Sequence, residues 1–276
     1  MKLYNFFRSG TSHRLRIALQ LKGLTPDYVP VDLRVDEQAE APFKAINPQG
    51  LVPALEIDNG QVLIQSPAII EWLEERYPTP ALLPADPEAR AHVRALAAIV
   101  GCDVHPINNR RILQTLRQQF GADEAAINAW CTTWITAGFD AIEALLARDG
   151  TRGSFCFGKA PGLADVYLIP QVESARRFGV DLARWPLISA VDAACSALPA
   201  FARACEVFAL AVGFGRACAA MPLPAFWTPC APTTSASRSA PTWACNAAPA
   251  TLSAPSITSG WQQLNRMAST PADANA

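Results

Sequence analysis

Residues 47–70 read NPQGLVPALEIDNGQVLIQSPAII. Two apolar runs, 51–57 and 62–64, flank the tripeptide Asp58-Asn59-Gly60. An Asn-Gly pair between apolar runs is a strong signal for a β-hairpin, because both turn residues must adopt positive φ. Ser66 then fits the N-cap of a helix. This stretch therefore predicts two antiparallel strands followed by a helix.

The residues before this stretch alternate between strand and helix signals. Residues 2–6 and 28–33 have the composition of short strands, and the apolar stripe over 15–21 predicts a helix that ends at Gly23. The resulting order, β-α-β-α-β-β-α, is the thioredoxin-like arrangement. We expect residues 1–80 to form an α/β, thioredoxin-like N-terminal domain.

A proline-dense linker over 77–87 separates this domain from a region without strand signals. Residues 87–205 are expected to form an all-α C-terminal domain. Apolar spacing typical of helices covers four segments: 90–112, 124–146, 163–178 and 191–198. His105-Pro106 indicates a break within the first of them.

The composition changes after residue 205. Residues 207–276 contain no Lys, a single acidic residue, Asp273, and many Ala, Pro, Ser and Thr. We expect 206–276 to be an Ala/Pro/Ser-rich, disordered tail. A stretch that is not a selected sequence, such as the product of a shifted reading frame, is the open alternative.

Charge and cysteine content narrow the possible classes of function. The chain has 276 residues, a net charge of -1 and eight cysteines. No overall field attracts nucleic acid, no apolar run of about 18 residues predicts a membrane span, and the cysteine spacing matches no metal site. The N-terminus lacks the apolar core of a signal peptide. We expect a cytoplasmic protein with neither nucleic-acid nor membrane partners.

The turn between the first strand and the first helix carries hydroxyl groups. Ser9, Thr11 and Ser12 surround Gly10. At a helix N-terminus, backbone N–H and side-chain O–H donors converge and stabilise an anion, and a thiolate there has a lowered pKa. An ordinary helix cap is the alternative.

Two further segments indicate a binding site for a peptide with a carboxylate. Val52-Pro53 opens a strand that must be central in the sheet, where proline is normally excluded. A cis peptide would turn the backbone groups of Val52 toward a bound peptide, whereas an edge strand is the alternative. Gln65-Ser66 opens a helix whose free N–H groups suit a carboxylate, although a plain N-cap also explains Ser66.

Together these segments resemble the glutathione-binding domain of the glutathione transferases, and the resemblance covers about residues 1–205. It implies that glutathione is the cofactor. Ser9-Gly10-Thr11 followed by Arg16-Ile17-Ala18-Leu19 is similar to the motif of the zeta class, with Gly10 and Thr11 in place of a Ser and a Cys. The implied glutathione contacts are Gln38 and Gln49 near the glycyl end, Val52 and Pro53 at the cysteinyl part, Gln65 and Ser66 at the γ-glutamyl carboxylate, and His105 and Asn109.

The zeta class implies a glutathione-dependent cis–trans isomerase that converts maleylpyruvate, or maleylacetoacetate, to the fumaryl isomer. The thiolate adds to the conjugated double bond, rotation follows, and the thiolate leaves. Ser9, Thr11 and Ser12 would lower the pKa of the thiol, with Arg8 beside them. Arg8, Arg110 and Arg177 are the expected partners of the two carboxylates, and Arg111 and Arg176 are expected on other helix faces.

Two alternatives stay open at this stage. A general glutathione transferase that conjugates electrophiles would share the fold and cofactor, and a non-catalytic protein of the same fold would serve as a scaffold. The resemblance also implies a homodimer and a small-molecule diacid as substrate.

Overall fold

A four-stranded sheet forms the N-terminal domain, in the order β2-β1-β3-β4. The strands are β1 (Lys2–Asn5), β2 (Asp27–Pro30), β3 (Ala54–Glu56) and β4 (Val62–Ile64). β1 pairs in parallel with β2, and β3 is antiparallel to both β1 and β4. The order of elements along the chain, β-α-β-α-β-β-α, is as predicted.

The computed structural model describes residues 1–150 and 152–211, which all fall within one compact unit, Met1–Met221. The helices of the sheet domain are α1 (Gly10–Leu21), α2 (Ala41–Ile46) and α3 (Ser66–Arg76), with a short 3-10 turn at Glu37–Ala39. The helices that follow are α4 (Pro87–Ala98), α5 (Arg110–Phe120), α6 (Glu124–Arg148), α7 (Leu163–Arg177), α8 (Pro186–Ser196) and α9 (Pro199–Ala211), with a π-helical turn at Ile99–Val104 and a 3-10 turn at Leu182–Arg184. The helical C-terminal domain is therefore confirmed.

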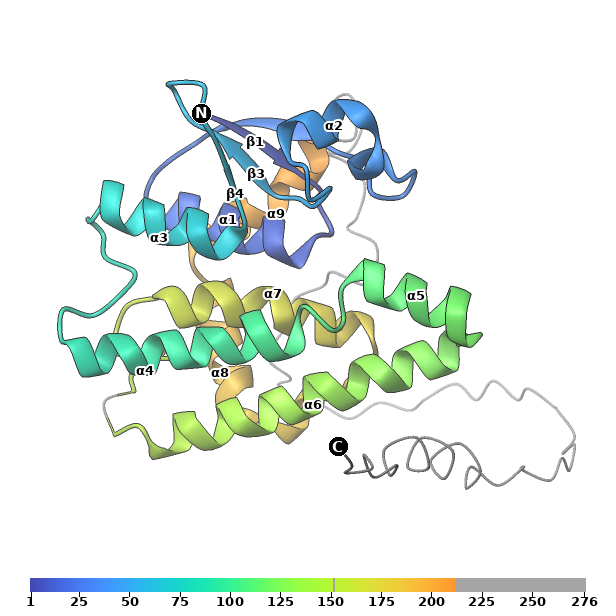
Figure 1. The fold of residues 1–276 in the computed structure, drawn as a ribbon. Helices are drawn as coiled ribbons and strands as arrows, with labels where there is room; N and C mark the ends of the chain where they lie inside the picture. Colours follow the sequence, from blue (N-terminus) through green and yellow to red (C-terminus); the bar gives the residue numbers. More distant parts are fainter. Residues whose placement is uncertain (151, 212–276) are drawn as a thin grey trace, which may run out of the picture. The chain divides into compact units, whose positions relative to one another are not determined.

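Helices α1 and α3 lie between the sheet and the helical layer, and α2 lies on the opposite face of the sheet (Figure 1). α1 packs against α7 and α9 as well as against α3. A single apolar core joins the two domains, from Leu3 and Leu15 to Val166 and Val172. A smaller apolar cluster around Phe43 fills the space beneath α2.

The hairpin and the proline in the central strand are both present. β3 and β4 pair in antiparallel fashion around the predicted turn, but only Gly60 has positive φ, and Asn59 does not. The Val52–Pro53 peptide bond is cis, as predicted.

One boundary prediction was wrong: Ser66 is the first residue of α3 and Gln65 is its N-cap. The helical spacing over 90–112 is interrupted at 105–109, where His105-Pro106 predicts a break, and α5 starts anew from Asn109, its N-cap. Helix α9 runs to Ala211, past residue 205, where the composition changes. The rest of the expected tail, 212–276, lies outside the described residues.

Glycine at position 162 fits a close contact at the start of α7. Leu163 N donates to the carbonyl of Leu82 in the linker at 2.8 Å, and a Cβ at Gly162 would lie 2.8 Å from the same oxygen. The carboxylate of Asp165 accepts from Gly162 N, which completes the helix start without a side chain at the N-cap. Helix α7 therefore begins where the sequence predicted.

Within the described residues, no single helix is long and apolar enough to cross a membrane. Only α8 and Pro199–Cys205 together meet that length and composition, and they are bent by 86°.

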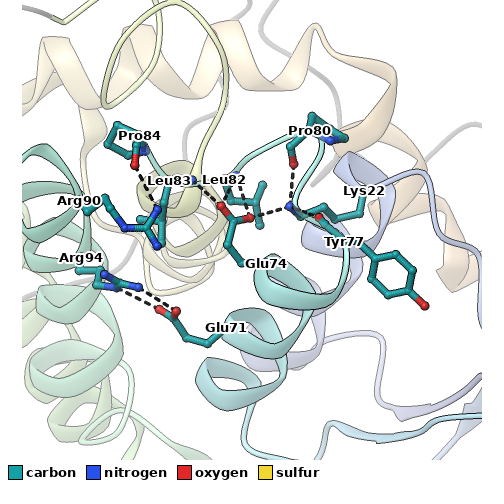
Figure 2. Close-up of polar contacts among 10 residues, drawn as sticks. All are labelled: Lys22, Glu71, Glu74, Tyr77, Pro80, Leu82, Leu83, Pro84, Arg90 and Arg94. Carbon is teal, nitrogen blue, oxygen red and sulfur yellow. Dashed lines mark hydrogen bonds and ion pairs between the residues drawn. The ribbon is translucent and has the colours of Figure 1, made fainter. Parts of the chain in front are cut away.

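A buried ion pair fastens the interdomain linker to the sheet domain (Figure 2). Lys22 Nζ, at the end of α1, donates to Glu74 of α3 and to the carbonyls of Tyr77 and Pro80 at 2.7 and 2.6 Å. The Lys22 side chain is 0% exposed and that of Glu74 is 10% exposed. Glu74 also accepts from the backbone N–H groups of Leu82 and Leu83. Two buried charges thus hold residues 77–83 of the linker against α1 and α3.

Replacing Glu74 by Gln should destabilise the protein by about 3–5 kcal/mol, because the Lys22 ammonium is left buried without its counter-charge. The free energy of unfolding in urea, followed by circular dichroism, measures the loss. Glu71→Gln is the matched control, because Glu71 pairs with Arg94 and the two side chains are 41% and 43% exposed. This substitution should lower the free energy of unfolding by no more than about 1 kcal/mol. Equal losses in the two variants would contradict the assignment.

Candidate functional site

A cleft lies between the two domains and takes its walls from both. Most of the lining comes from the sheet domain, and a second wall comes from the π-helical turn and the start of α5. The sheet domain contributes Thr11, Arg14, Asn47, Gln49, Leu51, Val52, Pro53, Gln65, Ser66 and Pro67, and the helical domain contributes Gly101, His105, Pro106, Asn109 and Arg111.

Three helices begin at this cleft: α1 near Thr11, α3 at Ser66 and α5 after Asn109. Helix N-termini carry unpaired N–H groups and the positive end of the helix dipole, so the cleft favours anions. No side chain caps α3, which leaves its first N–H groups available. Gln65, with φ 67°, donates its amide to Gln49 Oε1 instead.

A chain of hydrogen bonds joins the first turn of α1 to the central strand. Ser12 N donates to Ser9 Oγ at 3.3 Å, and Thr11 Oγ1 donates to the Val52 carbonyl at 3.0 Å. The Ser9 and Thr11 hydroxyl oxygens are 2.9 Å apart. Because Thr11 uses its only hydrogen for Val52, Ser9 is the donor in that contact. Thr11 lines the cleft at the end of this chain.

Ser12 does not reach the cleft. Its side chain is 0% exposed, and its Oγ accepts from Phe6 N at 3.4 Å. Ser12 therefore stabilises the turn, and Ser9 contacts Thr11 without lining the cleft itself.

Asn47 shapes the loop that carries Gln49. Its Oδ1 accepts from Gln49 N, and its Nδ2 donates to the Leu51 carbonyl at 2.7 Å. Gly50 has φ 63°, which favours glycine, and the Gln38 carbonyl oxygen would lie 3.0 Å from a Cβ there. Gln38 therefore lies behind the loop and not in the cleft lining.

Arg14 is a buried cation at the cleft that sequence reasoning left without a role. It is 2% exposed, donates from Nη1 to Ser66 Oγ at 3.3 Å, and lies 3.7 Å from the centre of the Tyr167 ring. Burial lowers the pKa of Arg14 to about 10, so it remains charged at neutral pH. Its Nε has no hydrogen-bond partner. In the described part of the chain no carboxylate pairs with it, which fits a site for an anion.

His105 lies against the start of α1. A Cβ at Gly10 would come within 3.3 Å of the His105 ring. Burial, followed by the charges of Arg14 and Arg177, lowers the pKa of His105 to about 3, so the ring is neutral at physiological pH. Its Nε2 is buried without a hydrogen-bond partner. His105 therefore adds no positive charge to the cleft, and the charged side chains in its lining are arginines.

The arginines of α5 lie opposite to their expected places. Arg111 lines the cleft, whereas Arg110 forms an ion pair with Asp36 of the sheet domain. Adjacent residues of a helix point about 100° apart, so only one of the two arginines can face the cleft, and the packing of α5 decides which one does.

Arg8 and Arg177 are exposed and do not line the cleft. Partial burial and the charge of Arg8 lower the pKa of Arg177, so these two cations are neighbours. The charge of Arg177 also lowers the pKa of His105, which lines the cleft, so Arg177 lies near that wall. Among the residues that the structure describes, neither has an ion-pair partner at close range. Arg177 Nη2 donates to Ser174 Oγ at 3.1 Å and its guanidinium lies over the Phe178 ring, and neither contact neutralises its charge.

The structure thus brings together seven of the predicted cofactor residues: Gln49, Val52, Pro53, Gln65, Ser66, His105 and Asn109. Of the predicted catalytic residues, only Thr11 lines the cleft directly. In residues 1–150 and 152–211, no three His, Cys, Asp or Glu side chains come together as a metal site.

Comparison with known proteins agrees with this geometry. Residues 8–76 match the family described as glutathione S-transferase, N-terminal domain, and residues 124–206 match the corresponding C-terminal domain. Maleylpyruvate isomerase from Ralstonia sp is 72% identical over 204 residues, which cover 74% of this chain and 96% of the relative. The chain belongs to the glutathione S-transferase family.

Other members extend the comparison. Maleylacetoacetate isomerase from Pseudomonas aeruginosa is 52% identical, over 74% of this chain and 95% of the relative. The holo structure of a maleylpyruvate isomerase described as a zeta-class bacterial glutathione S-transferase has a TM-score of 0.73 at 72% identity, covering 74% of this chain and 96% of that chain. Maleylacetoacetate isomerase from Anaeromyxobacter dehalogenans, with dicarboxyethyl glutathione and citrate bound in its active site, has a TM-score of 0.65 at 43% identity, covering 74% and 89%. This glutathione S-transferase is a zeta-class member.

Proposed function

We propose that this glutathione S-transferase is a glutathione-dependent cis–trans isomerase that converts maleylpyruvate, or maleylacetoacetate, to its fumaryl isomer. The observation that carries the proposal is a cleft at three helix N-termini, whose lining includes the cations Arg14 and Arg111. Relatives named for these two isomerase activities share 72% and 52% of the aligned residues.

Glutathione fits the groups that line the cleft. When bound, it supplies a thiolate that adds to the conjugated double bond and later leaves. Ser9 and Thr11, with the free N–H groups at the start of α1, would stabilise that negative charge and lower the pKa of the thiol. The Thr11 hydroxyl is held at the Val52 carbonyl, which keeps it beside the strand that would contact the cysteinyl part. Ser12 acts as a positioning residue behind this turn.

The carboxylates of glutathione have separate partners. Gln65, Ser66 and the start of α3 would hold the γ-glutamyl carboxylate, and Arg14 beneath Ser66 contributes its charge. Gln49 and Arg111 would hold the glycyl end, with Gln38 behind them. Val52 and Pro53 border the cysteinyl part, and His105 and Asn109 close the wall on the helical side.

The diacid substrate would lie across Arg8 and Arg177. Arginine forks bind carboxylates through two parallel hydrogen bonds, and two cations without carboxylate partners repel each other until an anion binds between them. We do not assign Arg110 to the substrate, since its guanidinium is engaged by Asp36.

The direct test follows the ultraviolet band of maleylpyruvate in the presence of the protein, with and without glutathione. We expect the band to decay only when glutathione is present, because no cysteine lines the cleft in the described part of the chain. Decay without glutathione would contradict the proposal. Formation of a stable conjugate in place of the fumaryl product would indicate a general transferase, and absence of any turnover would indicate a scaffold.

Arg177→Ala should raise the KM for the diacid by at least about tenfold and leave the KM for glutathione nearly unchanged, because hydrogen bonds to charged groups contribute about 1.5–3 kcal/mol. Steady-state kinetics with each substrate varied in turn measures both constants. Arg117→Ala, on the exposed side of α5, is the control and should change neither. An unchanged ratio of the two constants in Arg177→Ala would remove Arg177 from the substrate site.

We further propose a homodimer in the cytoplasm, on the basis of the family resemblance. Light scattering should give twice the mass of the 276-residue chain. The mass of a single chain would contradict this proposal and leave the proposed reaction untouched.

A further inference from the structure

An ion pair joins the sheet domain to α5 beside the cleft. Arg110, the first residue of α5, pairs with Asp36 in the segment between β2 and α2. The second contact, from Arg110 Nη2 to Asp36 Oδ2, is 3.4 Å. The two side chains are 38% and 50% exposed, so the pair lies at the surface.

Each end of this pair is closely connected to a residue that lines the cleft. Arg110 lies between Asn109 and Arg111, which both line the helical wall. On the other side, Asp36 accepts from Gln38 Nε2 at 2.9 Å, and the backbone of Gln38 packs against Gly50, next to Gln49 in the opposite wall. The pair therefore connects the two walls at the end where the glycyl part of glutathione would lie.

The backbone at Asp36 is adapted to this contact. Asp36 has φ 60° and ψ 28°, a left-handed conformation that Asp and Asn adopt more easily than other non-glycine residues. The conformation turns the chain so that the carboxylate meets both Gln38 and Arg110. Hydrogen bonds from Arg110 and Gln38 lower the pKa of Asp36, so the carboxylate is ionised at neutral pH.

We propose that the Asp36–Arg110 pair is a latch that positions the two walls around bound glutathione and slows its release. The inference rests on the proposed glutathione site and assigns Arg110 to positioning, not to contact with the substrate. An exposed ion pair adds little to stability, so breaking it should change the cleft and not the fold.

Asp36→Asn is the deciding variant, because asparagine keeps the left-handed backbone and removes only the charge. A latch predicts that the Kd for glutathione rises roughly two- to fivefold, with a faster dissociation rate and an unchanged unfolding midpoint. If Arg110 instead attracts the anionic ligand directly, removing the carboxylate frees its charge, and glutathione binds more tightly. Calorimetry gives the Kd for glutathione and stopped-flow kinetics gives its dissociation rate, so the two distinguish weaker from tighter binding.

Two further measurements define the latch. Arg110→Gln and the double variant Asp36→Asn/Arg110→Gln should weaken glutathione binding by the same factor as Asp36→Asn, because each removes the same pair. The difference from the wild type should shrink near 1 M salt, where exposed pairs are screened. Glu124→Gln is the matched control, since it breaks the exposed Arg117–Glu124 pair at the other end of α5 and should leave the Kd unchanged.

The outcomes separate the latch from the proposed function. Binding of glutathione by the wild type, with weaker binding by Asp36→Asn and no additivity in the double variant, supports the latch. Unchanged or tighter binding by Asp36→Asn overturns the latch and leaves the glutathione site intact. Absence of glutathione binding by the wild type overturns both.

Discussion

Helix α1 is buried along most of its length and yet carries polar and charged side chains, each of which needs a partner. Arg14 contacts Ser66 and the Tyr167 ring, and Arg16 donates to Asn5 and to the Ala204 carbonyl in α9. Lys22, just after the helix, pairs with Glu74 and the linker. These contacts fix α1 against α3, α7, α9 and the linker at once, and the two domains share one core around it.

The position of the cleft follows from this arrangement. Because α1 lies between the sheet and the helical layer, its first turn meets the cis proline strand on one side and His105 on the other. The starts of α3 and α5 reach the same place. A chain with a net charge of -1 thus acquires a local site for anions, made from helix ends and from arginines that lack carboxylate partners.

The arginines around the cleft differ in burial and in their partners. Arg14 is enclosed, and its charge acts through Ser66 at the floor of the cleft. Arg8 and Arg177 are exposed, and under the proposed function they would meet the diacid that enters from solvent. Arg110 is neutralised by Asp36, which gives it a mechanical role in the proposed latch. Four arginines of the same chemistry therefore lie in three different environments.

Local turn chemistry, helix starts and apolar periodicity were enough to predict the order of elements in the N-terminal domain, the hairpin, the cis proline and most of the expected glutathione contacts that line the cleft. They could not predict that Arg111 reaches the cleft in place of Arg110, that Ser12 is enclosed, or that Arg14 contacts Ser66. The burial and direction of these side chains depend on packing against elements that are distant in the sequence.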